Sequence, residues 1–68
     1  MVSANPENAS PLRAARQRAR LSMEQLAVSA GISRATLYWA EKAPQLMSDR
    51  TAQAVARVLG ISAEDLRP

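Results

Sequence analysis

The chain has 68 residues, enough for a single small domain of marginal stability, and nine Lys and Arg against six Asp and Glu give it a net charge of +3. It contains no Cys and no His, which excludes disulfides, the usual soft metal sites and the commonest acid-base group of enzymes, so we expect no metal, no cofactor and no catalytic activity. Because no apolar run approaches the length of a membrane span and the N-terminus lacks a signal-peptide core, we expect a cytoplasmic protein that makes no membrane contact.

The N-terminal segment leads into the first predicted helix. Its polar, aperiodic sequence assigns residues 1–10 to a flexible arm, and we assign residues 11–68 to the folded domain. Ser10 and Pro11 are typical of a helix start, with Ser as the N-cap and Pro at the first helical position. Three apolar residues then recur at helical spacing and predict the inward face: Leu12, Ala15 and Ala19.

The next two predicted helices are joined by a tight turn. Ser22 and Gln25 form a capping box at the start of the first of them, and Gly31 ends it as a residue that readily takes positive φ. Ser33 caps the second, which must end before Pro44 because the residue before a proline avoids the helical region. The inward faces of the pair are expected to consist of Leu26, Ala27, Ala30, Leu37 and Ala40. Such a pair predicts a helix-turn-helix, whose second helix can enter the major groove of DNA.

Two further helices complete the chain. Residues 43–47 are expected to form a loop whose Leu46 and Met47 fold back onto the core. Ser48 or Asp49 caps a fourth helix that ends at a glycine, and a fifth helix of one or two turns follows. The apolar stripe of the fourth helix consists of Ala52, Val55, Ala56 and Leu59. With many Ala and few aromatic residues, the sequence predicts an all-α fold, a compact bundle of five short helices.

The functional motif lies at residues 23–42, MEQLAVSAGISRATLYWAEK. Together with LRAAR at 12–16 and VARVLGISAEDL at 55–66, it resembles the Cro and phage-repressor class of helix-turn-helix domains, also called the XRE family. The resemblance extends over about residues 11–66 and implies a lambda-repressor-like DNA-binding domain. It further implies a sequence-specific transcription regulator, with repression as the expected mode, that acts at the nucleoid and inserts its third helix into the major groove of a short operator.

The resemblance also implies which residues meet double-stranded DNA. Ser33 would cap the recognition helix and touch a phosphate, and Lys42 and Arg50 would meet backbone phosphates. The full expected set of DNA-binding residues is Ser33, Arg34, Ala35, Thr36, Tyr38, Trp39, Lys42 and Arg50. Arg16 and Glu41 match a pair that forms a partly buried salt bridge between the first and third helices of similar domains.

A domain of this size covers only a few base pairs, so we expect a homodimer on a two-fold symmetric site. Its half-site centres would lie about 34 Å apart, one turn of the DNA helix. The expected dimer interface consists of Ile61, Leu66 and the end of the fourth helix.

Two of the departures from the family pattern concern Met23 and Ala40. Met23 stands where the family usually has Gln, and a thioether cannot donate that hydrogen bond to a phosphate. Ala40 replaces a large aliphatic residue, which leaves a gap in the core that Trp39, Leu46 or Met47 must fill.

The aromatic pair Tyr38 and Trp39 allows three interpretations. Trp39 could fill the gap beside Ala40, both rings could face DNA and meet thymine methyls or sugar edges, or both could form a protein-binding patch. For Tyr38 the DNA-facing interpretation is preferred, and for Trp39 the choice stays open. Accordingly, a second hypothesis for the protein is a helix-turn-helix scaffold that binds a host or partner protein. The abundance of Arg favours DNA, because the guanidinium group suits phosphates and guanine edges.

Overall fold

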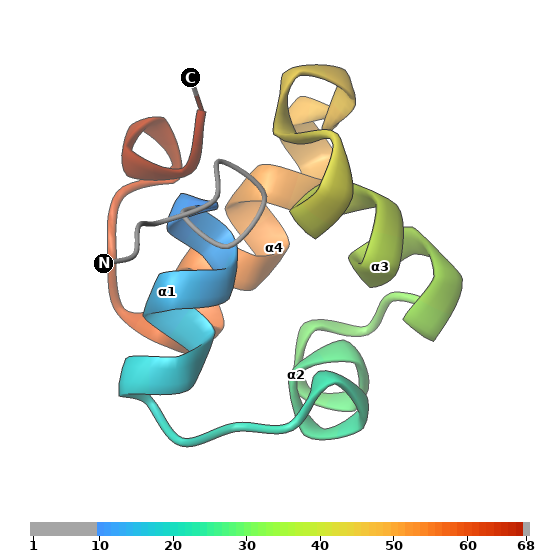
Figure 1. Cartoon of the computed structure of the whole chain (residues 1–68), viewed down its shortest axis with the longest axis vertical. Helices are drawn as coiled ribbons and strands as arrows, with labels where there is room; N and C mark the ends of the chain where they lie inside the picture. The colour runs from blue at the N-terminus through green and yellow to red at the C-terminus, as the bar shows by residue number, and fades with distance from the viewer. Residues whose placement is uncertain (1–9, 68) are drawn as a thin grey trace, which may run out of the picture.

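In the computed structural model, which describes residues 10–67, all regular secondary structure of the described chain is helical (Figure 1). Its elements are α1 (Pro11–Arg18), α2 (Met23–Ala30), α3 (Arg34–Lys42), the 3-10 turn η1 (Pro44–Leu46), α4 (Asp49–Leu59) and the 3-10 turn η2 (Ala63–Leu66). The predicted all-α bundle is confirmed, except that the fifth helix is a single 3-10 turn and that a further 3-10 turn occupies the loop after α3. Among the described residues, every helix is too short or too polar to cross a lipid bilayer.

Serine side chains begin all four α-helices. The Oγ of Ser22 accepts the Gln25 N–H at 3.0 Å while the Gln25 side chain accepts the Ser22 N–H at 2.8 Å, which completes the predicted capping box. Ser33 and Ser48 cap α3 and α4 in the same way. Ser10 caps α1 and is buried, so it belongs to the domain, while the rest of the expected N-terminal arm, residues 1–9, lies outside the described residues.

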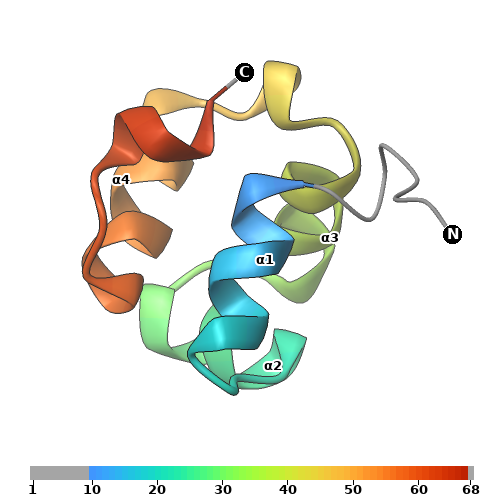
Figure 2. The same cartoon turned by 60° about the vertical axis from the view of Figure 1, so that its left-hand side comes forward.

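The core lies between α1, α2, α4 and the inward face of α3. Its largest fully buried side chains are Leu12, Leu26, Leu37, Val55 and Leu66. Alanines at the helix contacts, such as Ala27 and Ala52, allow the backbones to approach closely. In both views α2 lies at one end of the molecule and the connection from α3 to α4 lies near the other (Figures 1 and 2). With its inward face anchored in this way, α3 presents its other side to solvent.

A buried ion pair ties α1 to α3. The Nε of Arg16 donates to Oε2 of Glu41 at 2.6 Å, and its Nη2 donates to Oε1 at 3.3 Å. A third donor, Nη1, bonds to the Leu21 carbonyl at 3.0 Å, directly before the cap of α2. Only 12% of the Arg16 side chain and 8% of the Glu41 side chain are exposed. One guanidinium group on α1 therefore holds both α3 and the connection that leads into α2.

Two residues expected to face the core, Ala19 and Leu46, do not. Ala19 is the exposed C-cap residue of α1, because the helix ends at Arg18, earlier than the periodicity suggested. The loop was expected to bury both Leu46 and Met47, but η1 turns Leu46 outward with 79% of it exposed and buries only Met47. Trp39 is 63% exposed, so neither it nor Leu46 fills the gap beside Ala40.

Leu66 is not available for the dimer interface that the sequence suggested. It is fully buried, because η2 packs against both α1 and α4. The following residue, Arg67, fixes this end of the chain by donating to the Met47 carbonyl and pairing with Asp49 at the start of α4. Ile61 is partly buried against the same core, so it retains some surface for a second copy.

Two leucine-to-alanine substitutions test the corrected core. We expect Leu66→Ala to lower the free energy of unfolding by about 2–5 kcal/mol, because it empties a fully buried site. The matched control Leu46→Ala removes the same atoms from an exposed site and should change stability by less than about 0.5 kcal/mol. Urea unfolding followed by far-ultraviolet circular dichroism measures both. Equal stability of the two variants would contradict the placement of Leu66.

A double-mutant cycle tests the ion pair. We expect Glu41→Ala to cost about 3 kcal/mol of unfolding free energy, because it strands the buried guanidinium group of Arg16. The coupling free energy with Arg16→Ala should be about 1–3 kcal/mol in the same urea measurement. The more exposed pair of Arg67 and Asp49 is the control, with a coupling below about 1 kcal/mol. If the unfolding free energies lost in the Arg16 and Glu41 substitutions simply add, the two side chains do not interact and the ion pair is refuted.

Candidate nucleic-acid interface

The expected DNA-binding residues gather on the outer side of α3. Leu37, Ala40 and Glu41 are its buried residues, so the remaining positions of the helix face outward. All of the expected residues from the cap to the last turn are exposed: Ser33, Arg34, Ala35, Thr36, Tyr38, Trp39 and Lys42. Arg50 is also exposed but belongs to the first turn of α4.

The cap of α3 is built from two hydroxyl side chains. The Ser33 Oγ accepts the Thr36 N–H at 3.0 Å and lies 2.8 Å from the Thr36 Oγ1. This fixes the first turn, in which Arg34 is the first helical residue. A long cation at an exposed helix start is free of packing duties and suits contact with a base edge or a phosphate.

Two aromatic rings stand side by side on the outer surface of α3. The ring centroids of Tyr38 and Trp39 lie 5.2 Å apart, with an interplanar angle of 85°, an edge-to-face arrangement. Lys42 lies one turn further on, with its Nζ 5.9 Å from the Tyr38 ring centroid. Of the three interpretations of Trp39, its exposure rules out the one that buries the ring in the core.

A hollow on the Tyr38 side of α3 is rich in cations. It measures about 230 Å³, and we call it the cationic hollow; its lining residues are Arg13, Arg16, Met23, Tyr38, Glu41 and Lys42. Besides the ion pair of Arg16 with Glu41, the lining includes the cations Arg13 and Lys42. Hydrogen-bond donors with positive charge are the groups that bind phosphate.

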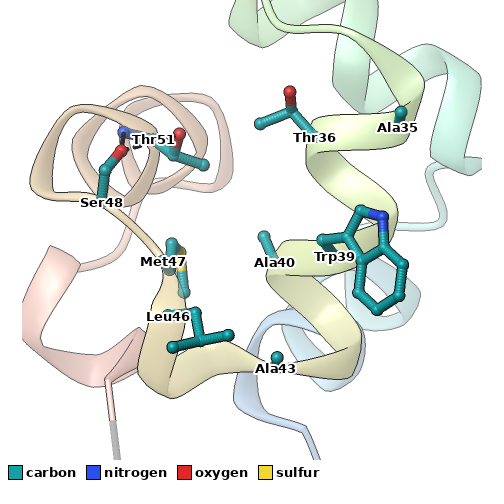
Figure 3. Close-up of a pocket in the computed structure, with 9 residues that line it drawn as sticks. All are labelled: Ala35, Thr36, Trp39, Ala40, Ala43, Leu46, Met47, Ser48 and Thr51. Carbon is teal, nitrogen blue, oxygen red and sulfur yellow. Dashed lines mark hydrogen bonds between the residues drawn. The ribbon is translucent and has the colours of Figure 1, made fainter.

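A larger hollow on the Trp39 side of α3 is apolar. It measures about 400 Å³, and we call it the apolar hollow; its lining residues are Ala35, Thr36, Trp39, Ala40, Ala43, Leu46, Met47, Ser48 and Thr51 (Figure 3). Among residues 10–67, the side chains that line it carry no charge. In Figure 3 the Ala40 methyl points toward Met47 across the hollow, whereas the Trp39 ring points outward from α3. The gap that the small Ala40 was expected to leave is thus open at the surface.

The sequence did not reveal every residue of these two hollows. Arg13 was not predicted as a site residue, and its three-residue spacing from Arg16 was the available signal. Ser48 was predicted only as a possible helix cap and Thr51 was not singled out, yet both line the apolar hollow opposite α3. Arg34 and Arg50 line neither hollow. Within residues 10–67, no three acidic side chains gather closely enough to hold a metal ion.

Comparison with known proteins agrees with this geometry. The sequence matches the protein family described as helix-turn-helix domain over residues 9–68, nearly the whole chain. It has no significant match among curated proteins or solved structures. The helix-turn-helix is a DNA-binding motif, and the matched range includes α2, the turn and α3 as well as both hollows. The resemblance to the Cro and phage-repressor class is confirmed, and the chain belongs to the helix-turn-helix domain family.

Proposed function

We propose that this protein is a sequence-specific transcription regulator, acting as a repressor, that inserts α3 into the major groove of a short operator. The observation that carries the proposal is the division of α3 into two faces. Its inner face is fixed by Leu37 and by the ion pair of Glu41, while its outer face exposes side chains suited to base edges and phosphates. A rigidly anchored helix with a chemically varied outer face is suited to reading sequence.

The cationic hollow supports a phosphate contact beside α3. Met23, at the first position of α2, offers no hydrogen-bond donor from its side chain, but it lies in the same hollow as Arg13 and Lys42. These two cations can bind a phosphate in place of the Gln side chain that Met23 replaces. Phosphate contacts of this kind fix the register of the protein on the duplex, and the base contacts of α3 then select the sequence.

Dimerisation on DNA belongs to the same proposal. One copy of α3 reads only a few base pairs, so a second copy on a two-fold symmetric site would supply the remaining affinity and specificity. Because Leu66 is buried, the contact between copies falls to Ile61 and the end of α4. A dimer bound in this way represses by occupying the operator.

Selection of bound sequences from random DNA duplexes tests the proposal directly. We expect one enriched sequence with two-fold symmetry, and its half-site spacing reports the distance between the two recognition helices. Affinity for that sequence should fall steeply as salt concentration rises, because bound cations displace counterions from phosphates. Enrichment of no sequence at any salt concentration would refute the proposal.

The alternative function is a protein-interaction module. The specific observation in its favour is the exposed apolar surface formed by Trp39 and Leu46 beside the apolar hollow. A module of this kind would bind its partner with little dependence on salt and would enrich no DNA sequence. The selection and the salt titration therefore separate the two functions.

Arg34→Ala tests direct base recognition. If Arg34 donates to a guanine edge, the substitution should weaken operator binding by about 1–3 kcal/mol and relax the preference at one base pair. Arg57→Ala, which removes an exposed Arg from the last turn of α4, is the matched control and should leave that preference unchanged. Titrations against the operator and single-base variants measure both effects. A uniform loss over all sequences would assign Arg34 to a phosphate, and no loss would remove it from the interface.

A further inference from the structure

We propose that the apolar hollow is a binding site for a small uncharged molecule, with an apolar body about the size of one or two aromatic rings. The site lies between α3 on one side and η1 with the first turn of α4 on the other (Figure 3). Binding of the molecule does not require DNA. Only its consequence for operator binding rests on the proposed function.

The floor of the apolar hollow is made of side chains too small to fill it. Ala40 contributes one buried methyl group from α3, and this group points toward the buried Met47 across the hollow (Figure 3). Protein interiors are otherwise closely packed, so a hollow of about 400 Å³ beside these two residues is a place where packing is incomplete. An apolar molecule that enters it gains the contacts that the side chains leave unmade.

The hydroxyl groups of the two serine caps turn the walls of the hollow apolar. Ser33 Oγ lies 2.8 Å from Thr36 Oγ1, and Ser48 Oγ lies 3.1 Å from Thr51 Oγ1. Because each Thr hydroxyl is held by its serine, each Thr methyl group is directed elsewhere. In Figure 3 the methyl groups of Thr36 and Thr51 extend toward each other from α3 and α4. The walls therefore suit an apolar surface better than a hydrogen-bonding one.

The size and charge of the hollow select a small molecule over a macromolecule. Nine residues line it, whereas a stable protein interface uses about 20–30 residues on each side. Small-molecule sites measure about 300–1,000 Å³, and an apolar cavity of about 150 Å³ already holds benzene. Within residues 10–67 the lining carries no charge, so an ionised ligand would lose hydration without gaining a partner. An uncharged molecule of one or two rings satisfies both conditions.

The hollow also borders the surface that is expected to meet DNA. Ala35, Thr36 and Trp39 belong to the expected DNA-binding set and line the hollow, although the Trp39 ring points outward from α3. A molecule held there occupies space beside α3 that the major groove would otherwise enclose. The molecule and the operator should therefore weaken each other's binding by the same factor, because coupling between two sites is reciprocal. On this arrangement, a small molecule bound in the hollow relieves repression.

Methyl NMR of the full chain without DNA tests the site directly. The probe is benzyl alcohol, an uncharged one-ring molecule, and benzoate is its charged counterpart. We expect benzyl alcohol to shift the methyl signals of Ala40, Met47 and Thr51 in a saturable way, with a Kd on the order of 1 mM, the strength available to so small a molecule. Benzoate should bind at least about tenfold more weakly, because its carboxylate has no partner in the lining.

Larger side chains in the hollow should displace the probe. Ala40→Leu extends a side chain from the floor and should lower the affinity for benzyl alcohol at least about tenfold, because the side chain and the probe cannot share the space. Thr51→Leu enters from the half-buried wall on α4 and decides the question if circular dichroism shows that Ala40→Leu does not fold. Ala19→Leu, at an exposed position outside both hollows, is the matched control and should bind like wild type.

Operator titrations test the consequence for repression. Benzyl alcohol at about ten times its Kd should lower the operator affinity of wild type by up to about tenfold, the limit for mutually exclusive binding. The operator affinity of Thr51→Leu should not respond to benzyl alcohol, because its hollow is filled.

Absence of saturable shifts in the hollow would overturn the site, as would wild-type affinity for benzyl alcohol in a folded Ala40→Leu or Thr51→Leu variant. Shifts of the same methyl signals on raising the protein concentration alone would also overturn it, since a second copy would then cover the hollow. Equal binding of benzoate would overturn the uncharged class of ligand. Unchanged operator affinity would overturn the effect on repression and leave the site intact. If no operator is found, the proposed function is refuted, and the methyl shifts still decide the site.

Discussion

The guanidinium group of Arg16 sets the geometry on which the rest of the domain depends. It bonds to both oxygens of Glu41 on α3 and to the Leu21 carbonyl just before α2. Removing two charges from water is costly, and such a pair is tolerated only when its geometry is good and its remaining donors are satisfied. The alanines of the core bring the helices close together, and apolar packing by itself has no preferred direction. The ion pair adds a directional constraint at α3.

The different chemistry of the two flanks of α3 follows from its neighbours along the chain. On one side it faces α1 and the start of α2, which contribute Arg13 and Met23. On the other it faces η1 and the first turn of α4, which contribute Leu46 and Thr51. Ala40 is central to the second flank, since a larger residue there would fill the hollow and remove the asymmetry. A single small residue of the core thus alters the surface that the helix presents.

Local chemistry made most of the fold predictable from the sequence. The serine caps, the capping box, and the glycines that end α2 and α4 depend on residues a few positions apart. These were predicted correctly, except that the cap of α4 was left open between Ser48 and Asp49. The wrong predictions concern side chains whose burial depends on tertiary packing. Leu46 and Met47 are adjacent at the end of η1, yet Leu46 is exposed and Met47 is buried. So short a turn has no sequence periodicity from which their burial could be predicted. An apolar residue near a chain end, such as Leu66, can equally well serve a core or an interface. The α3 residues of the candidate site came from the family resemblance, whereas the far walls of both hollows depend on how the helices meet.

The placement of Tyr38 and Trp39 also determines what spectroscopy of this protein can detect. They are the chain's only Tyr and Trp, and there is no Phe, so every aromatic chromophore lies on the outer face of one helix. In most small domains the near-ultraviolet signal comes from rings packed in the core and reports on folding. Here that signal arises outside the core, and the edge-to-face contact places the phenol within easy energy-transfer range of the indole. Aromatic absorbance and emission therefore report on the outer face of α3, while the peptide bands of circular dichroism are the direct measure of the helical interior.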